Sequence, residues 1–130
     1  MNTRRTTFRA LYLSILVLFF ACSKDEPAPT KSRDIKFEVT GNFSGTIDAT
    51  YITASGGATT ESLPSLPWTK SIIYQSTVSG TTITLGGGGG GVAGQTLKVK
   101  VFAGGSVVSE TPCVANSSGI VVVASPTYVF

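Results

Sequence analysis

Few residues in this 130-residue chain could carry out chemistry on a substrate. The chain has no histidine, and its two cysteines, Cys22 and Cys113, are far apart in the sequence. An enzyme usually needs a nucleophile beside a base, a cluster of metal ligands or a pair of carboxylates. From residue 34 onward the carboxylates stand singly in the sequence, at Asp34, Glu38, Asp48, Glu61 and Glu110. Glu38 and Asp48 could approach each other across a hairpin, but carboxylates on a strand surface are usually only solvated. We therefore predict a non-enzymatic protein with no catalytic residue, no metal site and no cofactor.

A glycine-rich stretch comes closest to a known ligand-binding motif. Gly86 to Gly91 is followed by Gly94, Gln95 and Thr96, and the segment differs by one residue from a phosphate-binding P-loop. Gln95 stands where that motif needs a lysine to reach the phosphates. The motif must also open a helix, whereas the residues after Thr96 alternate as in a strand. We expect a flexible loop between strands here, and no nucleotide.

The charge distribution argues against a nucleic-acid partner. The net charge of +3 comes from Arg4, Arg5 and Arg9, because from Cys22 onward seven basic residues balance seven acidic ones. From Asp34 onward four lysines oppose five carboxylates. A nucleic-acid-binding domain carries a basic surface, so we expect no nucleic acid to bind.

Residues 1–21 have the layout of a secretory signal peptide. A polar segment with three arginines precedes an apolar run from Ala10 to Ala21, which is the order of regions in such signals. The run is shorter than the roughly 20 residues that a membrane-spanning helix needs. We therefore predict a cleaved signal rather than a permanent span.

Cleavage is expected between Ala21 and Cys22. The stretch Phe19-Phe20-Ala21-Cys22 resembles a bacterial lipobox, in which a small residue precedes a cysteine that is lipidated on its thiol and becomes the new N-terminus. The resemblance implies lipidation of Cys22, and the alternative is an ordinary signal peptide that ends at a chance cysteine. A single acyl chain binds membranes only marginally, whereas the several chains of a lipoprotein give a stable anchor.

The residues after the cysteine carry a second resemblance. Ser23, Lys24, Asp25 and Glu26 look like the lipoprotein export signal of Bacteroidota, which accompanies transfer to the outer leaflet of the outer membrane. The resemblance implies a lipid-anchored outer-membrane protein exposed on the cell surface. The alternative is a short solvated charge cluster.

Composition divides the remaining chain into two parts. Residues 22–34 are polar and contain two prolines, so we expect a flexible tether that follows the lipidated cysteine. Residues 35–130 are rich in Thr, Ser, Val, Ile and Gly, and they show no convincing apolar period of 3.6 residues. These residue types favour pleated strands. We predict one all-β domain, an immunoglobulin-like antiparallel β-sandwich of about seven strands.

Alternation of apolar and polar residues predicts where the strands lie. Ile35, Phe37 and Val39, for example, share one face of the first strand. The expected strands cover 35–40, 46–53, 68–78, 81–85, 95–103, 106–111 and 119–124, with 127–130 extending the last one past Pro126.

Turn residues and apolar runs suggest how these strands pair. Ser79-Gly80 predicts a hairpin between 68–78 and 81–85, and Gly104-Gly105 predicts another between 95–103 and 106–111. The segment 119–124 is apolar at successive positions, which is typical of a central strand covered on both faces.

Trp68 and Cys113 each allow two interpretations. Trp68 follows a proline-rich loop that contains Leu66 and Pro67, and we expect it in the core. The alternative is that it joins other aromatic residues in a sugar-stacking surface. Cys113 would be the single remaining thiol after acylation of Cys22, and it is either buried as a small apolar residue or a site of intermolecular pairing.

Several short motifs are spread from Ile35 to the end of the chain. In chain order they are Phe37-x-Val39-x-Gly41, Tyr51, Leu66-Pro67-Trp68-x-Lys70, Gly104-Gly105 and Ser118-Gly119, and the most specific is Leu66-Pro67-Trp68. Together they resemble the MmpS family of small mycobacterial membrane proteins. The resemblance implies a β-sandwich behind a membrane anchor and a role as accessory subunit of a lipid or siderophore exporter.

The chain departs from that family in two respects. Its anchor is expected to be a lipid rather than a spanning helix, and the paired cysteines of the family are missing. The expected function is a non-enzymatic accessory or interaction module in association with a membrane transport or envelope complex. The alternative is a surface module that binds glycans or small lipophiles through the Gly86 to Gly91 loop and nearby aromatic residues.

Overall fold

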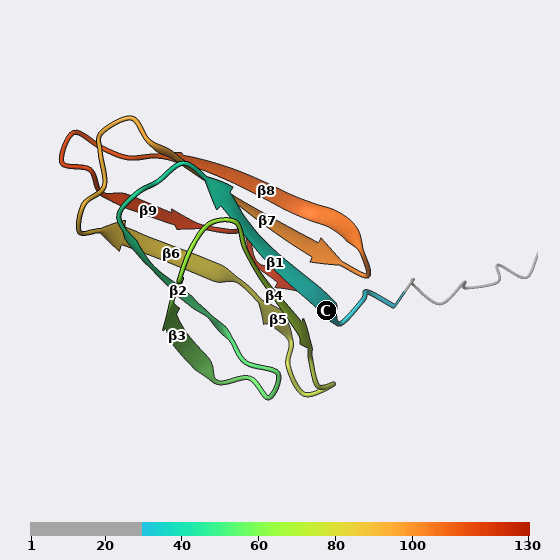
Figure 1. Cartoon of the computed structure of the whole chain (residues 1–130). Helices are drawn as coiled ribbons and strands as arrows, with labels where there is room; N and C mark the ends of the chain where they lie inside the picture. Colours follow the sequence, from blue (N-terminus) through green and yellow to red (C-terminus); the bar gives the residue numbers. More distant parts are fainter. Residues whose placement is uncertain (1–29) are drawn as a thin grey trace, which may run out of the picture.

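The computed structural model describes residues 30–130 and contains only β-strands, turns and loops in that range (Figure 1). Within those residues no helix is long and apolar enough to cross a membrane. The strands are β1 (Asp34–Gly41), β2 (Thr46–Ile52), β3 (Ala58–Ser62), β4 (Trp68–Ile73), β5 (Gly80–Thr81), β6 (Ile83–Gly88), β7 (Thr96–Ala103), β8 (Ser106–Val114), β9 (Val121–Ala124) and β10 (Tyr128–Val129).

Two four-stranded sheets form the layers of a sandwich (Figure 1). Sheet A has the strand order β4-β1-β7-β8, and sheet B has the order β3-β2-β6-β9. The short strands β5 and β10 pair separately, and every strand pair is antiparallel. The predicted all-β antiparallel sandwich is confirmed.

The core lies between the inner faces of the two sheets. Strict alternation in β1 and β7 buries every second side chain, and the lysines at positions 98 and 100 point outward, as predicted. The rings of Phe37 in β1 and Tyr51 in β2 lie 6.1 Å apart and join the two layers. Each large apolar side chain buried in this way contributes about 1.5–3 kcal/mol. The fully buried residues include Ile35, Phe37, Val39, Ala49, Ile83, Leu85 and Val99.

The strand predicted over 68–78 is shorter than expected and pairs differently. It ends at Ile73, and the buried residues Tyr74 and Val78 lie in the loop that follows. The predicted hairpin with 81–85 is wrong, because β6 pairs with β2 and β9 in the other sheet. The hairpin of β7 and β8 is confirmed, with β8 continuing to Val114.

The C-terminal strands also differ from the prediction. Segment 119–124 was expected to be central, but β9 is an outer strand of sheet B, and Val122 is 71% exposed. Residues 127–130 do not extend it, since β10 pairs with β5. Val122 is exposed because β9 lies at the edge of its sheet. The run of valines misled the prediction, since valine is favoured in strands whether or not both faces are covered.

The first half of the glycine run is strand rather than flexible loop. Gly86, Gly87 and Gly88 belong to β6 and pair with β2. A β-carbon on Gly87 would lie 2.8 Å from a methyl carbon of Val121 and 3.0 Å from the ring of Phe43. Glycine is therefore present here because neighbouring chains approach closely.

Candidate functional site

The predicted lipidation and export residues lie outside the described residues. They are Ala21, Cys22, Ser23, Lys24, Asp25 and Glu26. Their assignment as cleavage site, lipid attachment site and export signal remains a prediction from the sequence.

The N-terminal segment enters the sandwich at a well-defined place, which we call the tether root (residues 31–33). The guanidinium of Arg33 donates hydrogen bonds to the carbonyl oxygens of Gln75 and Val78, at 2.6 and 2.8 Å. It also lies over the ring of Phe130 at 4.6 Å from the centroid, and Lys31 lies over Tyr128 at 5.7 Å. The expected tether is therefore pinned to the domain at its last residues, beside the C-terminus (Figure 1).

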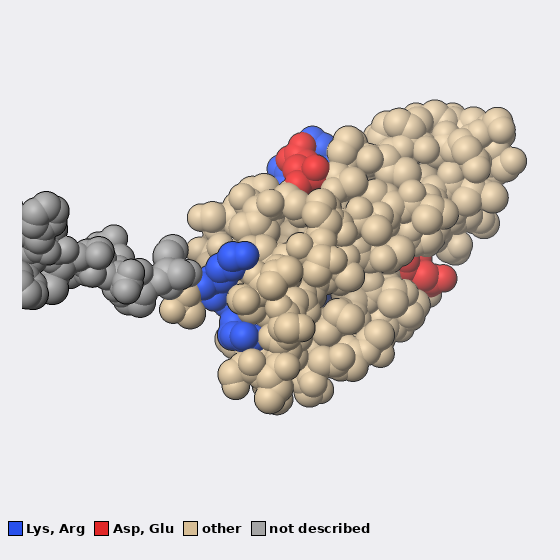
Figure 2. Space-filling model, turned by 180° about the vertical axis from the view of Figure 1, so that it is seen from behind, with Lys and Arg blue, Asp and Glu red and all other residues tan. Residues whose placement is uncertain are grey.

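Four loops gather at the opposite end of the sandwich, and we call them the loop end. Strand pairing brings them together, because β1, β3, β6 and β8 all finish where their partners begin. Lys, Arg, Asp and Glu are absent from all four. Figure 2 shows that the end of the molecule remote from the grey segment has no charged side chain on the visible face. The loops comprise residues 42–45, 63–67, 89–95 and 115–120.

Hydrogen bonds hold this end together. The side-chain oxygen of Gln95 accepts bonds from the N–H and hydroxyl of Ser44 and from the N–H of Val92, each at 3.0 Å. The side-chain oxygen of Asn42 accepts a bond from the N–H of Thr96 at 2.7 Å. Gln95 occupies the position of the P-loop lysine, but its side chain joins the loops 42–45 and 89–95. Thr96, which follows it, begins a strand instead of a helix.

Exposed aliphatic side chains lie at and beside the loop end. Val92, Val114, Ile120 and Val122 are between 45% and 71% exposed. The Cys113 thiol in β8 lies 3.5 Å from the carbonyl oxygen of Val122 in β9, so the two strands are in contact there. An exposed apolar area without charge is suited to contact with another protein.

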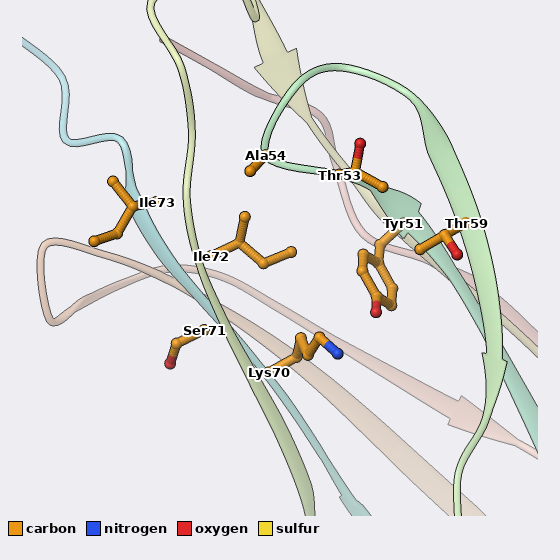
Figure 3. A pocket seen from close by; sticks show the side chains of 8 residues that line it. All are labelled: Tyr51, Thr53, Ala54, Thr59, Lys70, Ser71, Ile72 and Ile73. Carbon is orange, nitrogen blue, oxygen red and sulfur yellow. The ribbon is translucent and has the colours of Figure 1, made fainter.

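A groove of about 360 Å³ opens on the side of the sandwich where β4 faces β2 and β3. Lys70 and Tyr51 point toward each other across it, and Ile72 points into it (Figure 3). Its walls are mainly apolar. The lining residues are Tyr51, Thr53, Ala54, Thr59, Lys70, Ser71, Ile72 and Ile73.

One polar cluster crosses the groove. Glu61 Oε2 accepts hydrogen bonds from the Tyr51 hydroxyl at 3.0 Å and from Lys70 Nζ at 3.2 Å. Hydrogen bonding to Tyr51 and Glu61 raises the pKa of Lys70 above its ordinary value of 10.5. The ammonium therefore stays charged at neutral pH, and Glu61 compensates its charge, so the cluster ties the outer strands together and offers no free base.

Glu38 and Asp48, the carboxylate pair named in the sequence analysis, do not meet across a hairpin, because β1 and β2 belong to different sheets. Among residues 30–130 no group of His, Cys, Asp or Glu side chains could hold a metal ion. The buried Tyr74 hydroxyl bonds to the Ile52 carbonyl and to Thr81 Oγ1, both at 2.7 Å, and burial raises its pKa. This tyrosine is a structural residue.

Trp68 and Cys113 both occupy intermediate positions. Trp68 and Leu66 are half-buried and pack against the core, while Pro67 between them is exposed. The indole lies 6.4 Å from the ring of Tyr51. Cys113 is also half-buried and packs against the core. Phe43, next to the glycine run, and Tyr51, in the wall of the groove, are both largely buried.

Sequence reasoning missed the groove because it missed β3. Ala58–Ser62 contains no large apolar residue and shows no alternation of apolar and polar side chains. The available hint was its pair of threonines, which favour strands. Without β3 the open side of the sandwich could not be located.

Comparison with protein-family models and with curated proteins found no match for this chain. The resemblance to the MmpS family therefore rests on sequence motifs alone.

Proposed function

We propose that the mature chain is a lipid-anchored β-sandwich on the cell-surface side of the outer membrane, where it works as a non-enzymatic interaction module. The lipobox-like residues up to Cys22 and the export-signal-like residues 23–26 support the anchor. The observation that carries the interaction role is the position of the tether root and the uncharged loop end at opposite ends of the sandwich.

This arrangement presents the loop end away from the anchor. At about 3.3 Å per extended residue, residues 23–30 would reach roughly 25 Å from the bilayer. Because Arg33 fixes the chain to the domain, the sandwich would point its loop end outward whenever the tether extends. A neutral, partly apolar surface in that position suits a protein partner.

The resemblance to MmpS proteins supports a place in a membrane transport or envelope complex. An anchor in the outer leaflet would separate this domain from an inner-membrane pump. We therefore propose a partner at the outer membrane rather than an inner-membrane exporter.

Metabolic labelling with a fatty acid tests the anchor. We expect label in the wild-type protein and none in Cys22→Ala, while the matched variant Cys113→Ala keeps its label. Equal labelling of Cys22→Ala would refute lipidation at this residue.

Photo-crosslinking in intact cells tests the interaction surface. A crosslinking amino acid at the exposed Ser117, in the loop end, should give a discrete adduct with another protein. The same group at the exposed Ser106, the first residue of β8 at the tether-root end, should give little or none. Equal adducts from both positions, or only monomer from Ser117, would contradict the proposed orientation.

A further inference from the structure

Strand β4 has one free edge. The N–H of Tyr74 donates to the carbonyl of Arg33 at 3.0 Å, so the backbone groups of residues 74, 72, 70 and 68 face β1. In an antiparallel ladder the alternate residues face the other side. The N–H and C=O groups of Thr69, Ser71 and Ile73 therefore point away from sheet A.

The next residue in that outward row confirms the direction. The N–H of Gln75 donates to the carbonyl of Ala54 at 3.0 Å, across the mouth of the groove. For Thr69, Ser71 and Ile73, no backbone hydrogen bond beyond the strand ladders is found among residues 30–130. The edge is thus open over three alternate residues and closed at one end.

The outer strands on the opposite side of the sandwich are protected. β8 contains Pro112 and a bulge at its pairing with Val101 and Phe102, and both features block the addition of another strand. On β9 the Val122 carbonyl is occupied by the Cys113 thiol. β4 contains neither proline nor bulge, and Ile73 at its end is 76% exposed.

The groove lies where side chains of an added strand would point. A strand beside β4 would continue sheet A, and every second side chain would face sheet B. Tyr51, Thr59 and Ala54 form that facing wall, and Ile72 forms the adjoining one. Backbone pairing beside pockets for alternate side chains is how proteins bind extended peptides at a sheet edge.

Charge determines which peptide would fit. Lys70 and Glu61 neutralise each other across the groove, and the lining residues toward Ile73 carry no charge. A buried charged side chain on the peptide would find no partner there and would cost several kcal/mol. The complementary occupant has uncharged residues facing inward.

We infer that the β4 edge binds an extended, uncharged segment of a partner protein by strand addition, with aliphatic side chains at alternate positions in the groove. This deepens the proposed interaction role by naming a second contact surface. It does not depend on the lipid anchor.

Selection from a phage-displayed library of random octapeptides tests this inference on the full mature chain in detergent micelles. The key variant is Ser71→Pro, which removes an outward N–H but no bond to β1. The control is Thr60→Pro, which removes an outward N–H from β3. We expect enriched peptides with alternating aliphatic residues. Their affinity should fall about two- to tenfold with Ser71→Pro and little with Thr60→Pro, since the one ladder bond that is removed is worth about 0.5–1.5 kcal/mol.

Hydrogen exchange gives an independent measurement. The amides of Thr69, Ser71 and Ile73 should exchange quickly in the free protein and slow down with a selected peptide, while those of Lys70 and Ile72 are protected throughout. Ala54→Trp fills the groove without changing the β4 edge, and it should also abolish peptide binding. It replaces Ser71→Pro as the test variant if Ser71→Pro does not fold.

Three results would overturn the inference. They are a selection that enriches no peptide, peptide binding that survives both Ser71→Pro and Ala54→Trp, and loss of binding in Thr60→Pro alone. Binding of a fluorescent fatty acid that survives Ser71→Pro, without any selected peptide, would instead assign the groove to small lipophiles. Because the fatty-acid labelling of Cys22 is a separate measurement, failure of the anchor and failure of this site are distinguishable.

Discussion

The ring of Phe43 lies against the backbone of Gly91, in the space that a β-carbon on Gly91 would occupy. The carbonyl oxygen of Gly119 borders the same space. An aromatic ring and a backbone carbonyl thus together require a glycine at this position of a run that looks uniform in the sequence.

Gly91→Ala should destabilise the domain by about 1–3 kcal/mol, because ring and backbone must move apart. The matched control is Gly88→Ala, where a β-carbon would meet nothing within 4 Å. That change should be neutral or stabilising by about 0.4–1 kcal/mol. Thermal unfolding distinguishes the two, at about 4–8 °C in Tm for each kcal/mol. Equal tolerance of both variants would restore the interpretation of the run as a flexible loop.

Tyr74→Phe should cost about 1–3 kcal/mol, because it leaves the Ile52 carbonyl and the Thr81 hydroxyl without their buried partner. Denaturant unfolding measures the loss. Adding Thr81→Val should cost less than the sum of the two single changes, since it removes one of the orphaned groups. Additive losses would mean that the two hydroxyls do not interact.

Ser109→Ala should change stability by no more than about 0.5 kcal/mol or increase it, because its buried hydroxyl has no hydrogen-bond partner. Ser125→Ala is the contrasting variant. Its hydroxyl accepts a bond from the N–H of Ile83 at 3.2 Å, and we expect a loss of about 1–3 kcal/mol. A comparable loss in Ser109→Ala would show that this hydroxyl has a partner in solution.

The small stabilisation that Glu110 gives the domain should be lost in acid. A hydrogen bond from Lys98, whose Nζ lies 2.8 Å from the carboxylate, lowers the pKa of Glu110 below its usual 4.5, with Lys100 as a further cation. Because the pKa is lower in the folded state, the stabilisation is present above about pH 4.5 and is lost as the pH falls through the folded value. The advantage of wild type over Glu110→Gln in Tm should therefore shrink in acid, and it should be small throughout because the pair is exposed. A difference in Tm that stays constant from neutral to acidic pH would contradict the assignment.

The sequence predicted best those elements whose pattern is decided locally. In β1, β2 and β7 apolar and polar side chains alternate strictly, because one face of each strand covers the core. The alternation can be read from the sequence around Phe37 in β1 and around Val99 in β7. Pairing across the sandwich depends on residues far apart in the chain. Nothing near Ser79-Gly80 indicates that β6 joins β2 instead of β4, and nothing near Val122 indicates an outer strand.

The candidate sites show the same division. The lipidation site was inferred from adjacent residues, because a signal peptide is read as a linear sequence. The groove needs Tyr51, Glu61 and Lys70 from three strands, and β4 has a free edge because, among residues 30–130, only β1 pairs with it. These features depend on the whole fold and could not be deduced from the residues alone.

The position of β1 determines how the domain responds to mechanical load. Any pull on the N-terminal segment reaches the domain first at the tether root, through the bonds of Arg33. It then passes directly into β1, a strand bonded to β4 on one side and β7 on the other. A partner held at the loop end would pull in the opposite direction, along the strands. Ladder bonds lie perpendicular to the strands, so they would be loaded together in shear rather than opened one at a time. Under the proposed function, the domain would therefore transmit tension between its anchor and its partner along β1.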